Sequence, residues 1–310
     1  MRDSIRLTFL LHRFELIALA IATAVLVAAA IGVAGRLDAV GFGPCTDPIG
    51  SASARCEALA RVFYDIDQSQ ASPVLSFIAI LPYAAGLFLG GPLIAREIER
   101  GTTRLAWSIA PSRFRWYLAR MLPVVAAVLA LTFVAGFAAD LLTAARTPGV
   151  DVANAFDAYG TRGVLIPITA LVMTAGAVGL GAVTGRVLPT VILALILGAL
   201  GLQAVTKLHE RYTASEAIVV DQENVGRGDR YIDQFFKLPD GRMVGWNELA
   251  AIDPKALDSE EGQSRYPIVA LVIPGERYRA VEAREAITLG GIAVVMLAGT
   301  AVIVQRRRPG

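Results

Sequence analysis

The sequence predicts an all-α membrane protein with six transmembrane helices, both chain ends in the cytoplasm, and a small mixed α/β extracellular domain between helices 5 and 6. Three observations predict this fold class. Charged residues make up 18% of the chain, below the roughly 25% usual in soluble proteins, and the mean hydropathy is +0.56. Six apolar runs lack Asp, Glu, Lys and Arg, and each approaches or reaches the roughly 20 residues that span a bilayer core. Arginines are spread unevenly between the ends of these runs.

The six runs set the order of the predicted elements. A soluble protein with buried helices is a poor alternative, because it would need six fully apolar segments in 310 residues. A cleaved signal peptide is an alternative for the first run, which follows a basic start and has small residues near Ala34. Its apolar stretch, 16–35, is longer than the roughly 7–15 residues of a signal core. Residues 1–206 hold helices 1 to 5, at 14–35, 71–95, 113–143, 163–185 and 187–206, and residues 286–310 hold helix 6 and a basic tail.

The distribution of arginine predicts the orientation, because short cytoplasmic loops of membrane proteins are enriched in Arg and Lys. One set of ends carries thirteen arginines and the opposite short loops carry five. We therefore expect residues 96–120 and both termini to be cytoplasmic. The thirteen are Arg2, Arg6, Arg13, Arg96, Arg100, Arg104, Arg113, Arg115, Arg120, Arg186, Arg306, Arg307 and Arg308, and the five are Arg36, Arg55, Arg61, Arg146 and Arg162.

The two cysteines of the chain, Cys45 and Cys56, lie in the first predicted extracellular loop. We favour a disulfide between them, which would stabilise this loop by about 3 kcal/mol in an oxidising compartment. Two unpaired thiols are the alternative. No His or basic residue accompanies the pair, so a catalytic role is not expected.

Residues 207–285 are predicted to form the extracellular domain. Strands are expected at 215–220 and 266–274, and a hairpin at 235–244 that turns at Pro239-Asp240-Gly241. The stretch 246–252 predicts a short helix, for which Asn247 is the candidate cap.

The chain shows no chemistry of its own. None of its three lysines follows a glycine as a P-loop requires, and no His, Cys or acidic cluster has metal-ligand spacing. The apolar runs lack the buried charge that ion-coupled transport usually uses. We therefore expect no catalytic residue, no metal and no cofactor in this chain, and no nucleic-acid partner.

The loop 96–112, which follows the second run, is the most structured feature on the cytoplasmic side. Gly101 is expected to end the second helix, and Thr102 or Thr103 to begin a short helix that Pro111 stops. Leu105, Ala106 and Ile109 would form its apolar face, and Ser112 would cap the third helix. For Arg113, Arg115 and Arg120 we favour anchoring at lipid headgroups. Glu97 and Glu99 are unfavourable beside anionic lipid, and a basic partner surface explains them better.

This loop resembles that of ABC-2 type transporter permeases, the membrane subunits of type V exporter-like ABC systems. The segment R-E-x-E-x-G-T, which follows the second span in that family, is matched by Arg96, Glu97, Glu99, Gly101 and Thr102. The sequence departs from many members at Arg104, where they carry Glu, and this puts one polar contact of the loop in doubt.

Two shorter segments extend the resemblance, which covers the whole chain in topology and about 30 residues in motif. A Pro-Ser-Arg step leads into the third span, at Pro111, Ser112 and Arg113. The approach to the last span is similar to that of actinobacterial-type members, at Pro274, Arg277, Tyr278 and Glu282.

The resemblance implies a function. The chain would be the permease of an ATP-driven exporter in the bacterial cell membrane, multi-pass and not itself an enzyme. Two copies of a separate ATPase would bind ATP and Mg²⁺, and a second permease copy, identical or paralogous, would complete the transporter in the lipid bilayer. The alternatives are a membrane-anchored sensor or assembly factor acting through its extracellular domain, and an ATP-independent channel or secondary transporter. The implied ATPase-coupling residues are Glu97, Glu99, Gly101, Thr102, Arg104 and Leu105.

Overall fold

The computed structural model describes residues 10–46, 53–109, 112–254 and 265–307. The chain forms two compact units. The first lies within Met1–Pro148, Ala158–Lys207 and Glu282–Gly310, and the second within Gly149–Asp157 and Leu208–Val281.

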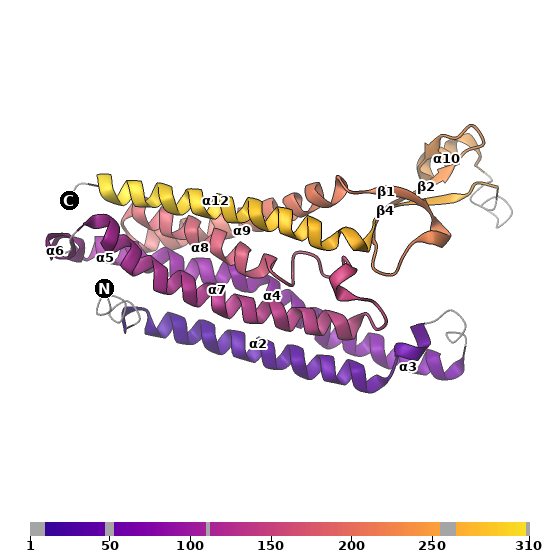
Figure 1. Ribbon diagram of the computed structural model, residues 1–310, viewed down its shortest axis with the longest axis horizontal. Helices are drawn as coiled ribbons and strands as arrows, with labels where there is room; N and C mark the ends of the chain where they lie inside the picture. Colours follow the sequence, from indigo (N-terminus) through magenta and orange to yellow (C-terminus); the bar gives the residue numbers. More distant parts are fainter. Residues whose placement is uncertain (1–9, 47–52, 110–111, 255–264, 308–310) are drawn as a thin grey trace. The chain divides into compact units, whose positions relative to one another are not determined.

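The first unit is a bundle of long helices (Figure 1). Within the described residues, six helices are long and apolar enough to cross a membrane, which confirms the predicted number. The helices are α2 (Arg13–Val40), the continuous helix Ala54–Glu99, α7 (Arg113–Arg146), α8 (Leu165–Thr184), α9 (Val187–Ala214) and α12 (Tyr278–Arg306), with the short α6 (Thr102–Ile109) between the second and third.

The second long helix begins at Ala54, well before the apolar run that starts at Ala71. Its N-terminal part is amphipathic, with charged residues that the apolar-run criterion excludes. It contains two π-helical segments, Asp67–Ala71 and Gly86–Gly90. Its α-helical parts are α3 (Ala54–Ile66), α4 (Ser72–Ala85) and α5 (Gly91–Glu99).

The helix α8 lies at the centre of the bundle. In its most apolar stretch 67% of the residues are buried, compared with 17% in α9. Two glycines of the second helix let its backbone approach α8 closely. A Cβ atom at Gly86 would lie 2.8 Å from the Met173 backbone, and one at Gly90 would lie 2.8 Å from the Thr174 carbonyl oxygen. The core of the bundle therefore depends on backbone contact at small residues, as in other membrane helices.

The second unit contains a four-stranded antiparallel sheet with the order β1-β4-β2-β3. The register pairs Val219 with Leu271 and Phe236 with Val244. Figure 1 shows β1, β2, β4 and α10 in this part of the chain. The elements are β1 (Ile218–Asp221), β2 (Arg230–Lys237), β3 (Met243–Val244), α10 (Trp246–Ile252) and β4 (Ile268–Ile273).

The sheet and α10 share a small core around Phe236 and Leu249, both fully buried. The turn between β2 and β3 contains Gly241 at a φ of 85°, a left-handed conformation that favours glycine. The prediction that Asn247 caps the short helix is wrong. The cap position is Gly245, and no side chain there bonds to the helix, because the helix begins at Trp246, one residue before Asn247.

Candidate functional site

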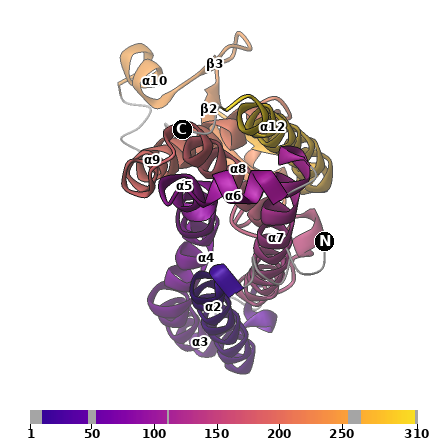
Figure 2. The same ribbon diagram turned by 90° about the vertical axis from the view of Figure 1, so that its left-hand side faces the viewer.

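The helix α6 lies across one end of the bundle, while α2 and α7 are seen down their axes in the same view (Figure 2). At this end α2, α7 and α9 begin and α5, α8 and α12 end, and we call it the basic end because Arg96, Arg113, Arg120 and Arg307 lie there. The connection from α5 to α7 through α6 is the region that matches the family motif.

Both ends of this connection form as the sequence predicts. Gly101 has a φ of 70° and donates its N–H to the carbonyl of Ile98 at 3.0 Å, which ends α5. Ser112 caps α7, because its hydroxyl accepts the N–H of Arg115 at 3.2 Å. Pro111, the predicted stop of the short helix, lies outside the described residues, and α6 ends at Ile109.

The outer surface of α6 is accessible. The side chain of Leu105 is 66% exposed, and Thr102 and Ser108 are also exposed, whereas Thr103 is buried. The Thr102 hydroxyl donates to the carbonyl of Glu97 at 3.1 Å and so joins α6 to the end of α5. Arg104 belongs to α6, but its side chain lies outside the described part of the structure.

Glu97 is turned inward and pairs with Arg120 of α7. The Nε atom of Arg120 lies 2.8 Å from Oε1 of Glu97, and the two side chains are 10% and 12% exposed. Anchoring at lipid headgroups is therefore the wrong interpretation for Arg120. The carboxylate of Glu97 has its cationic partner within the chain, and it fixes the end of α5 to α7.

Glu99 is exposed, and its Oε2 atom accepts the N–H of Val187 at 2.8 Å. Val187 is the first residue of α9, where backbone N–H groups lack helical partners and the helix dipole favours a negative charge. Glu99 thus joins the end of α5 to the start of α9 while its side chain remains accessible from outside.

A second polar contact joins α5 to α2. Arg96 donates to Glu15 at 2.9 Å, and His12 lies buried just before α2, with 4% of its surface exposed. Burial lowers the pKa of His12 below its ordinary value, Glu15 opposes this effect, and Arg96 and Arg120 add to it. The sequence gave no sign that Arg96 and Glu15, 81 residues apart in the chain, form a pair.

Two tryptophans that the sequence did not single out pack against each other between α6 and α7. The rings of Trp107 in α6 and Trp116 in α7 meet edge to face, with centroids 5.9 Å apart. The guanidinium carbon of Arg113 lies 4.6 Å from the centroid of the Trp107 ring, within cation–π range. Tryptophans in a short charged loop were the available signal for a packed helix rather than a simple connection.

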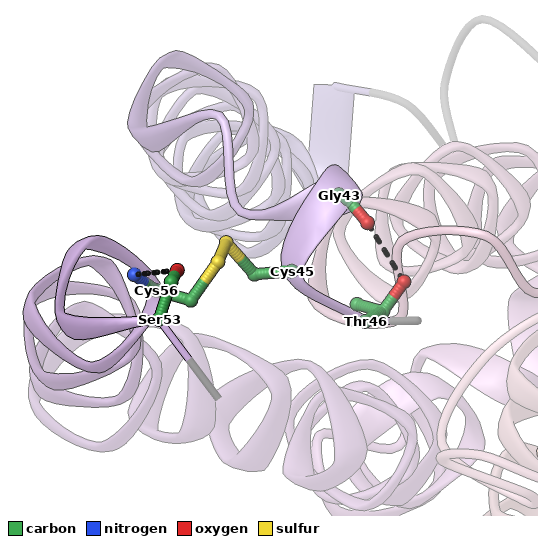
Figure 3. The surroundings of a disulfide bond; sticks show 5 residues. All are labelled: Gly43, Cys45, Thr46, Ser53 and Cys56. Atoms are coloured by element: carbon green, nitrogen blue, oxygen red, sulfur yellow. Dashed lines mark hydrogen bonds between the residues drawn. A yellow bond between two sulfur atoms is a disulfide. The ribbon is translucent and has the colours of Figure 1, made fainter. Parts of the chain in front are cut away.

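The opposite end of the bundle carries the disulfide. Cys45 and Cys56 are joined, with their Cα atoms 5.5 Å apart, at the start of α3 (Figure 3). The hydroxyl of Ser53 accepts the N–H of Cys56 at 3.2 Å and caps that helix. Ion pairs at this end join Arg146 to Asp67 and Arg162 to Asp140.

The described residues do not include a cluster of side chains that could bind a metal ion. Among residues 10–46, 53–109, 112–254 and 265–307, no group of three or more His, Cys, Asp or Glu side chains could hold a metal ion. The basic end presents a short helix, α6, with an exposed apolar side chain, Leu105.

Comparison with known proteins supplies the family. The model of the family described as "ABC-2 membrane transporter related" matches residues 16–211, more than half of the chain. That range contains three of the six long helices and α6 in full, together with most of α2 and α9. No curated protein and no solved structure matches the chain. The chain therefore belongs to the ABC-2 membrane transporter related family, and it is a multi-pass membrane transport subunit.

Proposed function

We propose that this chain is the permease of an ATP-driven exporter, and that α6 docks on a separate ATPase subunit. The observation that carries the proposal is the construction of α6. A short helix that leaves Leu105 66% exposed lies across the end of the bundle, where Glu97 fixes α5 to α7 and Glu99 joins α5 to α9. Movement of a helix held in this way would act on α5, α7 and α9 together.

The roles of the implied coupling residues differ in this proposal. Leu105 and Thr102 present the docking surface, with Glu99 at its edge, and Arg104 belongs to the same helix. Gly101 allows the chain to turn from α5 into α6. Glu97 does not touch the partner, since its side chain is only 12% exposed and pairs with Arg120. It positions α5.

The proposed cycle follows from the partner's chemistry. Two ATPase copies bind ATP and Mg²⁺, close on each other, and favour one conformation of a permease dimer over another. The permease chain binds neither ATP nor metal. The second permease copy is identical or paralogous, and export is the direction that the family resemblance implies.

The proposed orientation places the basic end in the cytoplasm of a bacterial cell, where ATP is available. Thirteen arginines against five in the short loops support this side, through the positive-inside rule. The disulfide Cys45–Cys56 lies at the other end of the bundle, which would face the oxidising exterior. The second unit, which follows α9, would also lie outside.

The test uses the full chain, tagged and purified in mild detergent from its native host. We expect a P-loop ATPase to co-purify, identified by mass spectrometry. Leu105→Ala should reduce the recovered ATPase about tenfold, the effect of losing a central apolar contact worth about 1.4 kcal/mol. Leu188→Ala is the matched control, because Leu188 is 70% exposed at the start of α9, and it should leave recovery unchanged.

A second measurement separates the alternatives. The pair reconstituted in nanodiscs should hydrolyse ATP at a rate that depends on the permease. Absence of any ATPase from the purified wild-type chain would overturn the proposal. Ion conduction by the chain alone would favour a channel, and binding of a ligand to the second unit alone would favour a sensor.

A further inference from the structure

The C-terminal end of α12 is held by an arginine from another helix. Nη1 of Arg113, the first residue of α7, donates to the carbonyl oxygens of Gln305 at 2.9 Å and Arg307 at 2.7 Å. The last carbonyls of a helix lack intrahelical partners and carry partial negative charge. Arg113 thus serves α12 as a cap supplied from outside the helix.

The same guanidinium also contacts α6. It lies over the Trp107 ring, 4.6 Å from the centroid, and Trp107 packs on Trp116. One side chain therefore touches the docking helix on its flat face and the end of α12 through its N–H groups. Lysine would not reproduce the contact with Trp107, because its ammonium is a point charge on a flexible stem and lacks the planar face of the guanidinium.

A second arginine continues the connection. Arg307, just past the end of α12, donates to the carbonyl of Ala182 and, at 3.3 Å, to that of Val183, in the last turn of α8. A Cβ atom at Gly185 would collide with the Arg307 guanidinium, so glycine at this position leaves it room. The end of α12 is thereby joined to the end of α8, the central helix of the bundle.

The neighbouring arginines show a contrast. Arg115 lies two residues after Arg113, and Arg306 lies one residue before Arg307. Both are exposed, as expected of arginines that face lipid headgroups or water. Arg115 and Arg306 therefore supply exposed positive charge at this end of the bundle. The hydrogen bonds that Arg113 and Arg307 make to other helices call for a different explanation.

We propose that Arg113 and Arg307 form an arginine relay that transmits movement of α6 to the ends of α12 and α8. The relay rests on the proposed function, in which α6 docks on the ATPase. Both arginines are positioning residues. They touch neither nucleotide nor substrate, and they make the inner ends of α6, α12 and α8 move as one body when the ATPase closes.

The test compares charge-conserving variants of the full chain with matched controls. Arg113→Lys and Arg307→Lys break the relay, and Arg115→Lys and Arg306→Lys change the exposed neighbours in the same way. Spin labels are placed at two exposed pairs of positions, Ser108 with Leu188 and Val302 with Leu188, so that both distances are measured to α9, which is not part of the relay. Distances within each pair are measured in nanodiscs with the ATPase bound, without nucleotide and with ATP–vanadate.

In the wild-type chain both label distances should change on trapping with ATP–vanadate. In Arg113→Lys the ATPase should still bind and the distance from Ser108 should still change, but the Val302 distance should stay fixed. Stimulation of ATP hydrolysis should fall about tenfold, within the usual range for coupling between two sites. Trp107→Leu should behave like Arg113→Lys, and Trp107→Phe, which keeps a ring face, should retain most of the stimulation.

Two failures are distinguishable. If the wild-type chain binds no ATPase, the proposed function fails and the relay with it. If the wild-type chain couples and both relay variants couple as well as Arg115→Lys and Arg306→Lys, the relay alone is wrong. A purely structural role for the two arginines would lower the unfolding temperature of the variants and leave the nucleotide-dependent distance change intact, and this result also overturns the relay.

Discussion

Glu97 and Arg120 form an ion pair 2.8 Å long between α5 and α7, with both side chains almost removed from solvent. The pair stands directly behind the loop that carries α6. A charge in such a place is stable only while its partner is present, because the desolvation of each ion is offset by the other. The pair therefore makes the position of the loop sensitive to single substitutions.

Arg120→Met should destabilise the protein strongly, because it leaves the Glu97 carboxylate buried without its cation. We expect a loss of about 3–5 kcal/mol in the free energy of unfolding. The double variant Glu97→Gln, Arg120→Met should recover most of this loss. Reversible unfolding in detergent micelles, followed by tryptophan fluorescence, provides the measurement.

The exposed pair Arg242–Asp240 of the second unit is the control for this prediction. Its side chains are 64% and 51% exposed. Arg242→Met should therefore cost less than about 1 kcal/mol. Equal small effects at both pairs would show that the Glu97–Arg120 pair is hydrated in the membrane protein.

Gly90→Ala should destabilise the bundle by overpacking. The added Cβ atom would lie 2.8 Å from the Thr174 carbonyl oxygen and 2.9 Å from the Ala177 Cβ atom, so the two helices must separate. We expect a cost of about 1–3 kcal/mol, measured as a lower unfolding temperature in detergent.

Gly291→Ala provides the matched substitution in another membrane helix. A Cβ atom at Gly291 would meet nothing within 4 Å. Alanine has a higher helix propensity than glycine by about 1 kcal/mol, so this variant should be neutral or slightly stabilised. A similar loss at both positions would mean that glycine flexibility, rather than close packing, matters at Gly90.

The sequence predicted what depends on local chemistry. Six long apolar helices follow from runs of apolar residues, and the turns at Gly101 and Gly241 follow from residues that tolerate a left-handed backbone. The cap at Ser112 was also correct. The cap at Asn247 was wrong because the helix begins two residues earlier than the preference of Asn for cap positions predicts, with Gly245 at the cap.

Partners across the bundle could not be predicted from a single sequence. Gly86 and Gly90 let their helix approach α8 closely, and only the fold shows that α8 is the helix they meet. Arg113 and Arg115 have the same chemistry and lie two residues apart. One turns inward to α12 and the other outward, because their directions on α7 differ and the neighbours of that helix are set by the tertiary structure.

Removal of the disulfide should loosen the end of the bundle opposite α6. Reduction, or the paired variant Cys45→Ser, Cys56→Ser, frees a loop with a sequence separation of 11. We expect the free energy of unfolding to fall by about 3 kcal/mol, from the greater entropy of the unfolded chain.

Binding at the docking loop serves as the control for the disulfide variants, because the loop and the disulfide lie at opposite ends of the bundle. Binding of the ATPase in the co-purification assay should be unchanged, because α6 lies at the other end of the bundle. Alkylation and mass spectrometry check the oxidation state before each measurement. Loss of ATPase binding on reduction, with the chain still folded, would contradict the separation of the two ends.

His12 should make the protein less stable in mild acid. Its side chain is 4% exposed, and burial lowers the pKa of the folded state below the ordinary value of 6.5. Above that value the imidazole is neutral in both states and contributes nothing. As the pH falls below it, the unfolded chain takes up a proton that the folded chain resists, so the folded state loses stability.

The expected loss is at most about 1.4 kcal/mol for each pH unit, since one proton is involved. The measurement is the unfolding temperature in detergent at pH 7.5 and pH 5.5. His12→Asn should show a smaller acid shift than the wild-type chain, and His209→Asn reports what the other histidine contributes. If His12→Asn and the wild-type chain lose the same stability between these two pH values, protonation of His12 does not oppose folding. The cationic surroundings provided by Arg96 and Arg120 would then be screened by water that reaches the start of α2.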